Sequence, residues 1–189
     1  MIPGIDTSQI ISRDRAVKLA DLGYEFACRY YRRSLHGRWT IDHDEARGLC
    51  DAGLSLVSVF QGDKATMKAA YYNSANAEID AMAALAKAHD MRQTPESAVY
   101  FAVDTDITNE TIGGVLEYFS VVTAHFAGSP WVVGAYGDDL VCLETFDRKL
   151  ATVAWLTNAK GWLTDKEFLE FDIKQTSLPM TIMPGLQVD

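Results

Sequence analysis

The hydrophobic pattern of the chain alternates between short apolar runs and longer segments in which apolar residues recur at helical spacing. The runs at 54–60 and 98–103 are almost continuously apolar, which is typical of strands buried on both faces of a sheet. The segments at 42–52 and 75–89 have the composition and spacing of helices. Strands and helices that alternate in this way predict βα units around a parallel sheet.

The pattern extends over most of the chain. The predicted strands lie at 2–6, 25–31, 54–60, 98–103, 131–136, 152–156, 171–175 and 186–188, and the predicted helices at 11–22, 42–52, 75–89, 109–126 and 138–149. Thr7 or Ser8 is the expected cap of the first helix. After residue 150 the pattern weakens, and one short helix around 165–170 is expected. We predict a compact TIM-type (β/α)8 barrel, irregular in its last quarter, although 189 residues is short against the roughly 250 typical of that fold.

A doubly wound open sheet is the alternative fold. Its dinucleotide-binding form needs three glycines in the first strand-to-helix turn, and the turn at 4–8 (GIDTS) lacks them. A P-loop is absent as well. With no internal repeat, low-complexity tract or linker rich in Pro, Gly or Ser to mark a boundary, we expect a single domain over 1–189.

The charge of the chain narrows the choice of partners. Lys and Arg number 17 against 26 Asp and Glu, which gives a formal net charge of −9, the wrong sign for attraction to nucleic acid or anionic lipid. Cys28, Cys50 and Cys142 are too few and too far apart for a disulfide scaffold, and they lack the close Cys/His spacing of a zinc site. No metal and no organic cofactor is expected. No apolar run approaches the roughly 18 residues of a membrane-spanning helix, so we expect no membrane insertion.

Polar side chains follow the C-terminal ends of several predicted strands. They are Asp6, Arg29, Tyr31, Gln61, Asp104, Asp106, Tyr136, Gln175 and Asp189. In a parallel barrel these ends open on one rim, where barrel enzymes place their chemistry. Carboxylates act on a glycosidic oxygen, aromatic faces stack on sugar rings, and Gln or Arg binds hydroxyl groups. The set therefore predicts a sugar site.

Each of these residues also has a structural interpretation. Asp6 and Asp106 could cap the helices that follow them, and Arg29 could pair with a structural carboxylate. The aromatic residues, Trp155 included, could belong to the core. A structural role is harder to find for Asp104, which directly follows the buried strand at 98–103. Partial desolvation at that position would favour its protonated form and suit it to donate a proton.

Short motifs spread over nearly the whole chain carry a family resemblance. They include Gly-Ile-Asp at 4–6, Val-Tyr-Phe-Ala-Val-Asp-Thr-Asp at 99–106, Gly-Ala-Tyr-Gly at 134–137, and Gln-Val-Asp at 187–189. With these motifs the chain resembles the bacterial glycoside-hydrolase-like domain related to the family 25 lysozymes. In those lysozymes the fourth strand ends in Asp-x-Glu, whose Glu donates the proton, and further carboxylates come from the first and last strands.

The resemblance implies roles for matching positions. The proton donor falls on Asp104, and the other carboxylates fall on Asp6 and Asp189. Ala102 stands where the lysozymes have the first Asp of the pair, and Asp104 is one methylene shorter than Glu. The resemblance therefore implies a sugar-binding site more firmly than it implies turnover.

Together these observations lead us to expect a hydrolase of bacterial peptidoglycan that cuts between amino sugars as a muramidase does. Asp104 would be the general acid and Asp6 the second carboxylate, with Asp106 and Asp189 supporting them. The substrate-binding residues would be Arg29, Tyr31, Gln61, Tyr136, Trp155 and Gln175. The alternatives are a non-catalytic glycan-binding module of the same fold and a hydrolase of another bond, against which the missing metal ligands count.

The beginning of the chain has neither the basic region nor the apolar region of a signal peptide. We therefore expect the protein to be made in the cytoplasm and to reach the cell wall by lysis or by a dedicated secretion system.

Overall fold

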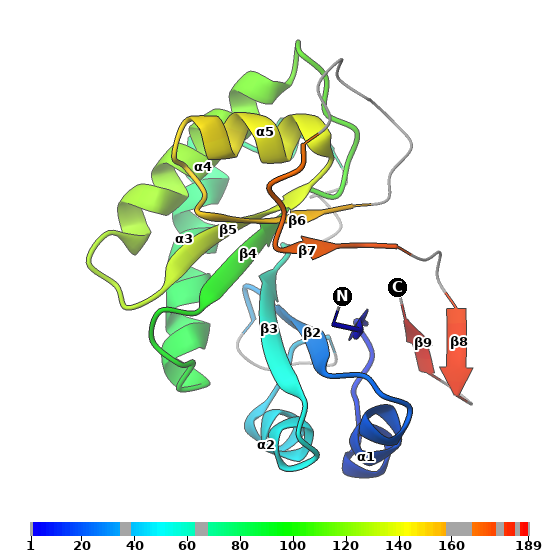
Figure 1. The fold of residues 1–189 in the computed structure, drawn as a ribbon. Coiled ribbons are helices and arrows are strands. Elements are labelled where there is room, and N and C mark those ends of the chain that lie inside the picture. Colours follow the sequence, from blue (N-terminus) through cyan, green and yellow to red (C-terminus); the bar gives the residue numbers. More distant parts are fainter. Residues whose placement is uncertain are drawn as a thin grey trace.

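The computed structural model describes residues 2–34, 39–62, 68–157, 168–176, 180–183 and 186–188. Within these ranges seven strands form one curled sheet, paired in sequence order (Figure 1). They are β1 (Gly4–Asp6), β2 (Phe26–Tyr31), β3 (Ser55–Phe60), β4 (Ala98–Ala102), β5 (Val132–Gly137), β6 (Val153–Leu156) and β7 (Ile173–Lys174). All six pairings are parallel. The predicted parallel sheet is confirmed.

Five α-helices connect the strands and cover the outside of the curled sheet in the described part of the chain (Figure 1). They are α1 (Arg13–Asp21), α2 (His43–Asp51), α3 (Ser74–Asp90), α4 (Ile112–Phe126) and α5 (Asp139–Asp147), and a short 3-10 turn, η2 (Ala69–Tyr71), precedes α3. All five were predicted, because their apolar residues recur at helical spacing. None of the described helices is both long enough and apolar enough to span a bilayer.

Polar side chains define where the helices begin. Asp42, Asn73 and Asp138 accept hydrogen bonds from the backbone N–H groups of the first turns of α2, α3 and α5. The prediction that Thr7 or Ser8 caps the first helix is wrong. Ser12 is the cap of α1, and its hydroxyl accepts the Arg15 N–H at 3.4 Å.

The described residues form a curled half-barrel rather than the predicted complete (β/α)8 barrel. Among them β7 pairs with β6 and has no pairing with β1. The expected eighth strand exists as β9 (Leu186–Val188), but it pairs antiparallel with β8 (Met180–Met183) in a separate hairpin. The hairpin lies beside the β1 end of the sheet (Figure 1), where Thr7 Oγ1 donates to Gln187 O at 2.7 Å. Of the helix expected at 165–170, residues 168–170 are not helical and the rest lies outside the described residues.

The sheet has two apolar faces, since side chains alternate along each strand. One face packs against the helices through residues such as Val99, Phe101 and Ala135. The other lines the hollow of the half-barrel, with Cys28, Val59, Tyr100, Ala102 and Trp155 as its buried residues. Paired residues of neighbouring strands share a face, so the strand register decides which polar side chains reach the hollow.

Candidate functional site

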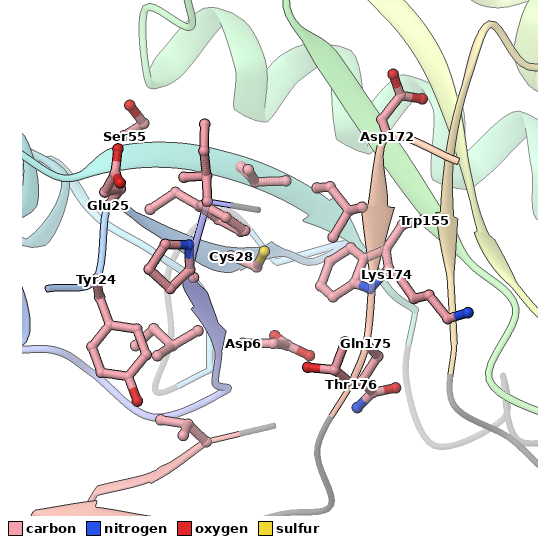
Figure 2. Close-up of a pocket in the computed structure, with 18 of the residues that line it drawn as sticks. Asp6, Tyr24, Glu25, Cys28, Ser55, Trp155, Asp172, Lys174, Gln175 and Thr176 are labelled. Carbon is pink, nitrogen blue, oxygen red and sulfur yellow. The ribbon is translucent and has the colours of Figure 1, made fainter. Parts of the chain in front are cut away.

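A cavity of about 820 Å³ occupies the hollow between β1–β3 on one side and β6–β7 on the other. Of the predicted site residues, Asp6, Trp155 and Gln175 line it, together with Lys174 and Thr176. Figure 2 shows the Asp6 side chain pointing toward Gln175 and Thr176. The structure therefore brings together three predicted residues, from β1, from β6 and from the position directly after β7.

Asp6 ends β1 and is almost fully buried, with 3% of its surface exposed. The Tyr30 hydroxyl donates a hydrogen bond to Asp6 Oδ2 at 2.9 Å. Burial raises the pKa of Tyr30 well above its usual value, and the charge of Asp6 raises it further. Tyr30 therefore keeps its proton and holds the Asp6 carboxylate in one orientation at the wall of the cavity.

An aromatic wall stands on β4, β5 and β6. Trp155 packs edge-on against Tyr136, with ring centroids 4.7 Å apart, and against Tyr100 at 6.1 Å. Trp155 is only 2% exposed, so it forms part of the wall rather than an open stacking surface. Tyr136 is half-buried and faces the same hollow, because its register partners are Ala102 and Trp155.

A second group of predicted residues lies at the ends of β3 and β4. Gln61 Nε2 donates to Asp104 Oδ2 at 2.9 Å, and the Tyr72 hydroxyl accepts the Asp104 N–H at 3.3 Å. Asp104 and Asp106 are both exposed. The partial burial expected for Asp104 is therefore not present in the structure.

The two groups are joined along the carboxyl edge of the sheet by Arg32. Its guanidinium lies over the Tyr30 ring, 4.9 Å from the centroid. Its Nη1 donates to Gln61 O at 3.0 Å and to Gly62 O at 2.7 Å. A continuous series of contacts thus runs from Asp6 through Tyr30, Arg32 and Gln61 to Asp104.

Arg29 and Tyr31 lie on the other face of β2, so the structure does not bring them together with Asp6, Gln175 and Trp155. Arg29 is 1% exposed and pairs with Glu45 on α2, with Nε to Oε1 at 2.7 Å and Nη2 to Oε2 at 3.1 Å. The Tyr31 hydroxyl donates to Gln93 Oε1 at 2.9 Å, and burial raises the pKa of Tyr31 to about 12. Both side chains connect the sheet to the helices and to the segment before β4.

Sequence reasoning missed Tyr30 and Arg32 as site residues. The pairing of Asp6 with Cys28 places residues 28 and 30 on the face that lines the hollow, and this register cannot be predicted from the apolar pattern of β2, which is buried on both faces. Asp189, the remaining predicted carboxylate, lies outside the described residues. Within the described ranges no group of three or more His, Cys, Asp or Glu side chains is placed to hold a metal ion.

Three solved structures share this fold. The chain superposes on the Mycobacterium tuberculosis Tat-secreted protein Rv2525c with a TM-score of 0.78 and 18% identity, covering 97% of this chain and 92% of that one. The CTP1L endolysin gives 0.63 and 13%, covering 97% and 63%. A muramidase from Trichobolus zukalii gives 0.53 and 10%, covering 86% and 81%. At these identities the likeness shows the fold alone.

Sequence relatives and a family model extend the comparison. The uncharacterized Bacillus subtilis (strain 168) proteins YbfG and FadG are 24% and 25% identical to the chain over 166 and 158 residues. These matches span 81% and 80% of the chain but only 22% and 27% of the two relatives. The model of the Rv2525c-like, glycoside hydrolase-like domain matches residues 17–181, most of the chain. The chain therefore belongs to the Rv2525c-like, glycoside hydrolase-like domain family.

Proposed function

We propose that the chain is a glycoside hydrolase that cuts bacterial peptidoglycan between amino sugars, as a muramidase does. The observation that carries the proposal is the placement of two carboxylates at one edge of the sheet. Asp6 is the last residue of β1 and Asp104 follows β4, and a series of contacts through Tyr30, Arg32 and Gln61 joins them. Two carboxylates that flank one glycosidic bond are what its hydrolysis requires.

Asp104 is the general acid in this proposal. The Gln61 amide occupies Oδ2, which leaves Oδ1 to carry the proton for the glycosidic oxygen. Exposure of the side chain gives a bulky polysaccharide access to it. Because the amide of Gln61 is neutral, it can hold Asp104 in either protonation state, as an acid that later acts as a base requires.

Asp6 is the second carboxylate. It is buried at the cavity wall and its Oδ2 is held by Tyr30, so its charge can orient a water molecule or stabilise the positive charge of the transition state. Gln175 is the proposed ligand of sugar hydroxyl groups, with Tyr136 and Trp155 as the apolar wall. Asp106 and Asp189 are proposed to support the two main carboxylates.

A glycan-binding module without catalysis is the second candidate. Ala102 stands where the family 25 lysozymes have an Asp, and its side chain, 6% exposed, packs among the inner-face residues of the sheet. A site that lacks this acidic side chain can still bind a sugar through its aromatic side chains and amides. It has less negative charge with which to stabilise the transition state of glycoside hydrolysis.

Clearing and binding of purified peptidoglycan separate the two candidates. For a hydrolase, the wild-type chain clears a suspension, and Asp104→Asn lowers the rate by about 10²-fold to 10⁴-fold while binding to sedimented sacculi is kept. Asp21→Asn, at an exposed carboxylate at the end of α1, is the matched control and should clear like the wild type. If the wild type binds without clearing, the module is correct. Absence of both binding and clearing would contradict both candidates.

A further inference from the structure

Behind the sheet, α3 carries a carboxylate that is fully closed off from solvent. Asp80 is 0% exposed, and it accepts hydrogen bonds from Arg33 Nε at 2.7 Å, Tyr71 OH at 2.6 Å and Tyr118 OH at 2.8 Å. Three donors and one positive charge compensate for the water that the carboxylate has lost. We call these four residues the Asp80 cluster. None of them lines the cavity beside Asp6.

Tyr72 connects the Asp80 cluster to the end of β4. Its ring packs edge-on against Tyr71 and Tyr118, with centroids 5.4 Å away in both cases. Its hydroxyl donates to Ala102 O at 3.1 Å and accepts the Asp104 N–H at 3.3 Å. The backbone on both sides of residue 103 is thereby fixed at the point where Asp104 leaves the strand.

Arg33 connects the Asp80 cluster to the side chain of Asp104 by a second route. Arg33 also donates to Tyr71 OH at 2.8 Å and to Asn76 Oδ1 at 3.0 Å, so its position is determined by several partners. Its neighbour Arg32 donates to Gln61 O at 3.0 Å, and Gln61 Nε2 binds Asp104 Oδ2. An anchored Arg33 therefore restricts Arg32, which restricts Gln61.

We infer that Asp80 is a positioning residue for Asp104. Two series of contacts lead from the Asp80 carboxylate to Asp104: one, through Tyr72, reaches its backbone N–H, and the other, through Arg33, reaches its side chain. The inference rests on the proposed function only in giving Asp104 the role of general acid. Loss of the Asp80 cluster leaves Asp104 present but loosely held, and misplacement of a reacting group by about 1 Å can lower a rate on the order of 10²-fold. A purely structural Asp80 would stabilise the fold without affecting Asp104.

The test measures the position of Asp104 separately from activity. The full chain is labelled with ¹⁵N, and the Asp104 backbone amide and the Gln61 side-chain amide are followed by NMR in Asp80→Asn and Tyr72→Phe. Tyr72→Phe keeps the ring and removes only the hydroxyl that fixes the end of β4. Thr123→Val is the matched control. It removes a partly buried hydrogen bond that belongs to neither route, the one from Thr123 Oγ1 to Leu150 O at 2.6 Å.

Asp80→Asn and Tyr72→Phe should both shift or broaden the Asp104 amide signal, and Asp80→Asn should also shift or broaden the Gln61 side-chain signal. They should lower kcat for peptidoglycan hydrolysis by about 10-fold to 100-fold with KM nearly unchanged, whereas Thr123→Val leaves signals and kcat as in the wild type. Wild-type signals for both groups in Asp80→Asn and Tyr72→Phe, with only a lower Tm, would overturn the inference. If Asp80→Asn does not fold, Tyr118→Phe, which removes only the hydroxyl that donates to Asp80 Oδ2 at 2.8 Å, decides the inference by the same Asp104 signal. A wild-type chain without hydrolysis contradicts the proposed function, and the NMR result then still decides the inference.

Discussion

Gln61 Nε2 lies 2.9 Å from Asp104 Oδ2 and donates a hydrogen bond to it. The contact follows from topology, because β3 and β4 are parallel neighbours and their carboxyl ends meet at one edge of the sheet. A neutral donor fixes the orientation of a carboxylate without fixing its charge, which suits the general-acid role proposed for Asp104. The consequence can be tested by changing the charge of residue 61.

Gln61→Glu should move the alkaline limb of the pH–activity profile to higher pH. Two carboxylates in hydrogen-bond distance share one proton, because they cannot both ionise freely, so the acid form persists to higher pH. Gln61→Met, similar in size and uncharged, should lower kcat without moving that limb. The profiles are measured as initial clearing rates across pH. An unchanged limb in Gln61→Glu would show that Gln61 does not contact the ionising acid.

The two adjacent glycines of α4 should respond to alanine in opposite ways. A Cβ on Gly114 would lie 2.7 Å from Tyr72 O, a backbone atom, whereas a Cβ on Gly113 would meet nothing within 4 Å. Gly114→Ala should therefore cost about 1–3 kcal/mol in unfolding free energy through overpacking, and should disturb Tyr72 and Asp104. Gly113→Ala should stabilise the helix by up to about 1 kcal/mol. Urea denaturation measures both, and an equal effect at the two positions would contradict the close contact of α4 with Tyr72.

We predict that the Arg29–Glu45 ion pair stabilises the fold and takes no part in binding peptidoglycan. Glu45 Oε1 also accepts the Ile11 N–H at 2.8 Å, and both side chains are at most 2% exposed. Arg29→Met leaves a buried carboxylate without its cation, which should lower the unfolding free energy by about 3–5 kcal/mol. The double variant with Glu45→Leu should recover part of the loss. Folded Arg29→Met should bind peptidoglycan like the wild type, and a selective loss of binding would restore Arg29 as a ligand.

The correct predictions came from features that are local in the chain. The strand at 98–103 and the helix at 75–89 are defined by their own apolar residues, and the parallel order follows from their alternation. The face of the sheet toward which each side chain of a strand points was harder to predict. Both faces of β2 are buried, so its apolar pattern does not say whether Arg29 or Tyr30 faces the hollow. Only the pairing of Asp6 with Cys28 decides it.

The last quarter was less predictable because its elements are short. β7 has two residues, fewer than a periodic pattern needs. The strand at 186–188 was correctly placed, but the apolar pattern carries no information on its partner. In the structure that partner is β8, through an antiparallel hairpin. The Gln61–Asp104 contact likewise depends on residues separated by 43 positions, so only the sheet order brings it about.

Asp138→Asn should stabilise the chain at neutral pH. Asp138 caps α5 by accepting the Val141 N–H at 2.9 Å, and burial raises the pKa of its carboxyl above the usual value, with Asp139 adding to the rise. The native state therefore binds this proton more tightly than the unfolded chain does, and stability falls as pH rises above the unfolded-state value of about 3.9. Asn caps equally well and carries no charge.

Thermal unfolding across pH checks this expectation. The Tm gain of Asp138→Asn should be present at pH 7 and should disappear in acid, where Asp138 is itself neutral. Asp42→Asn is the control, because Asp42 caps α2 in the same way but is exposed, so its Tm change should be smaller. A lower Tm for Asp138→Asn at pH 7 would mean that the charge of Asp138 stabilises the helix more than burial opposes it.

Mass analysis of the fragments released from purified sacculi tests the central claim most directly. Wild-type protein is expected to release muropeptides with new reducing ends at one kind of bond between amino sugars, while Asp104→Asn and Asp6→Asn release almost none and still bind the sacculi. Fragments cut at a peptide or phosphodiester bond would contradict the account. So would fragment release by Asp104→Asn at the wild-type rate.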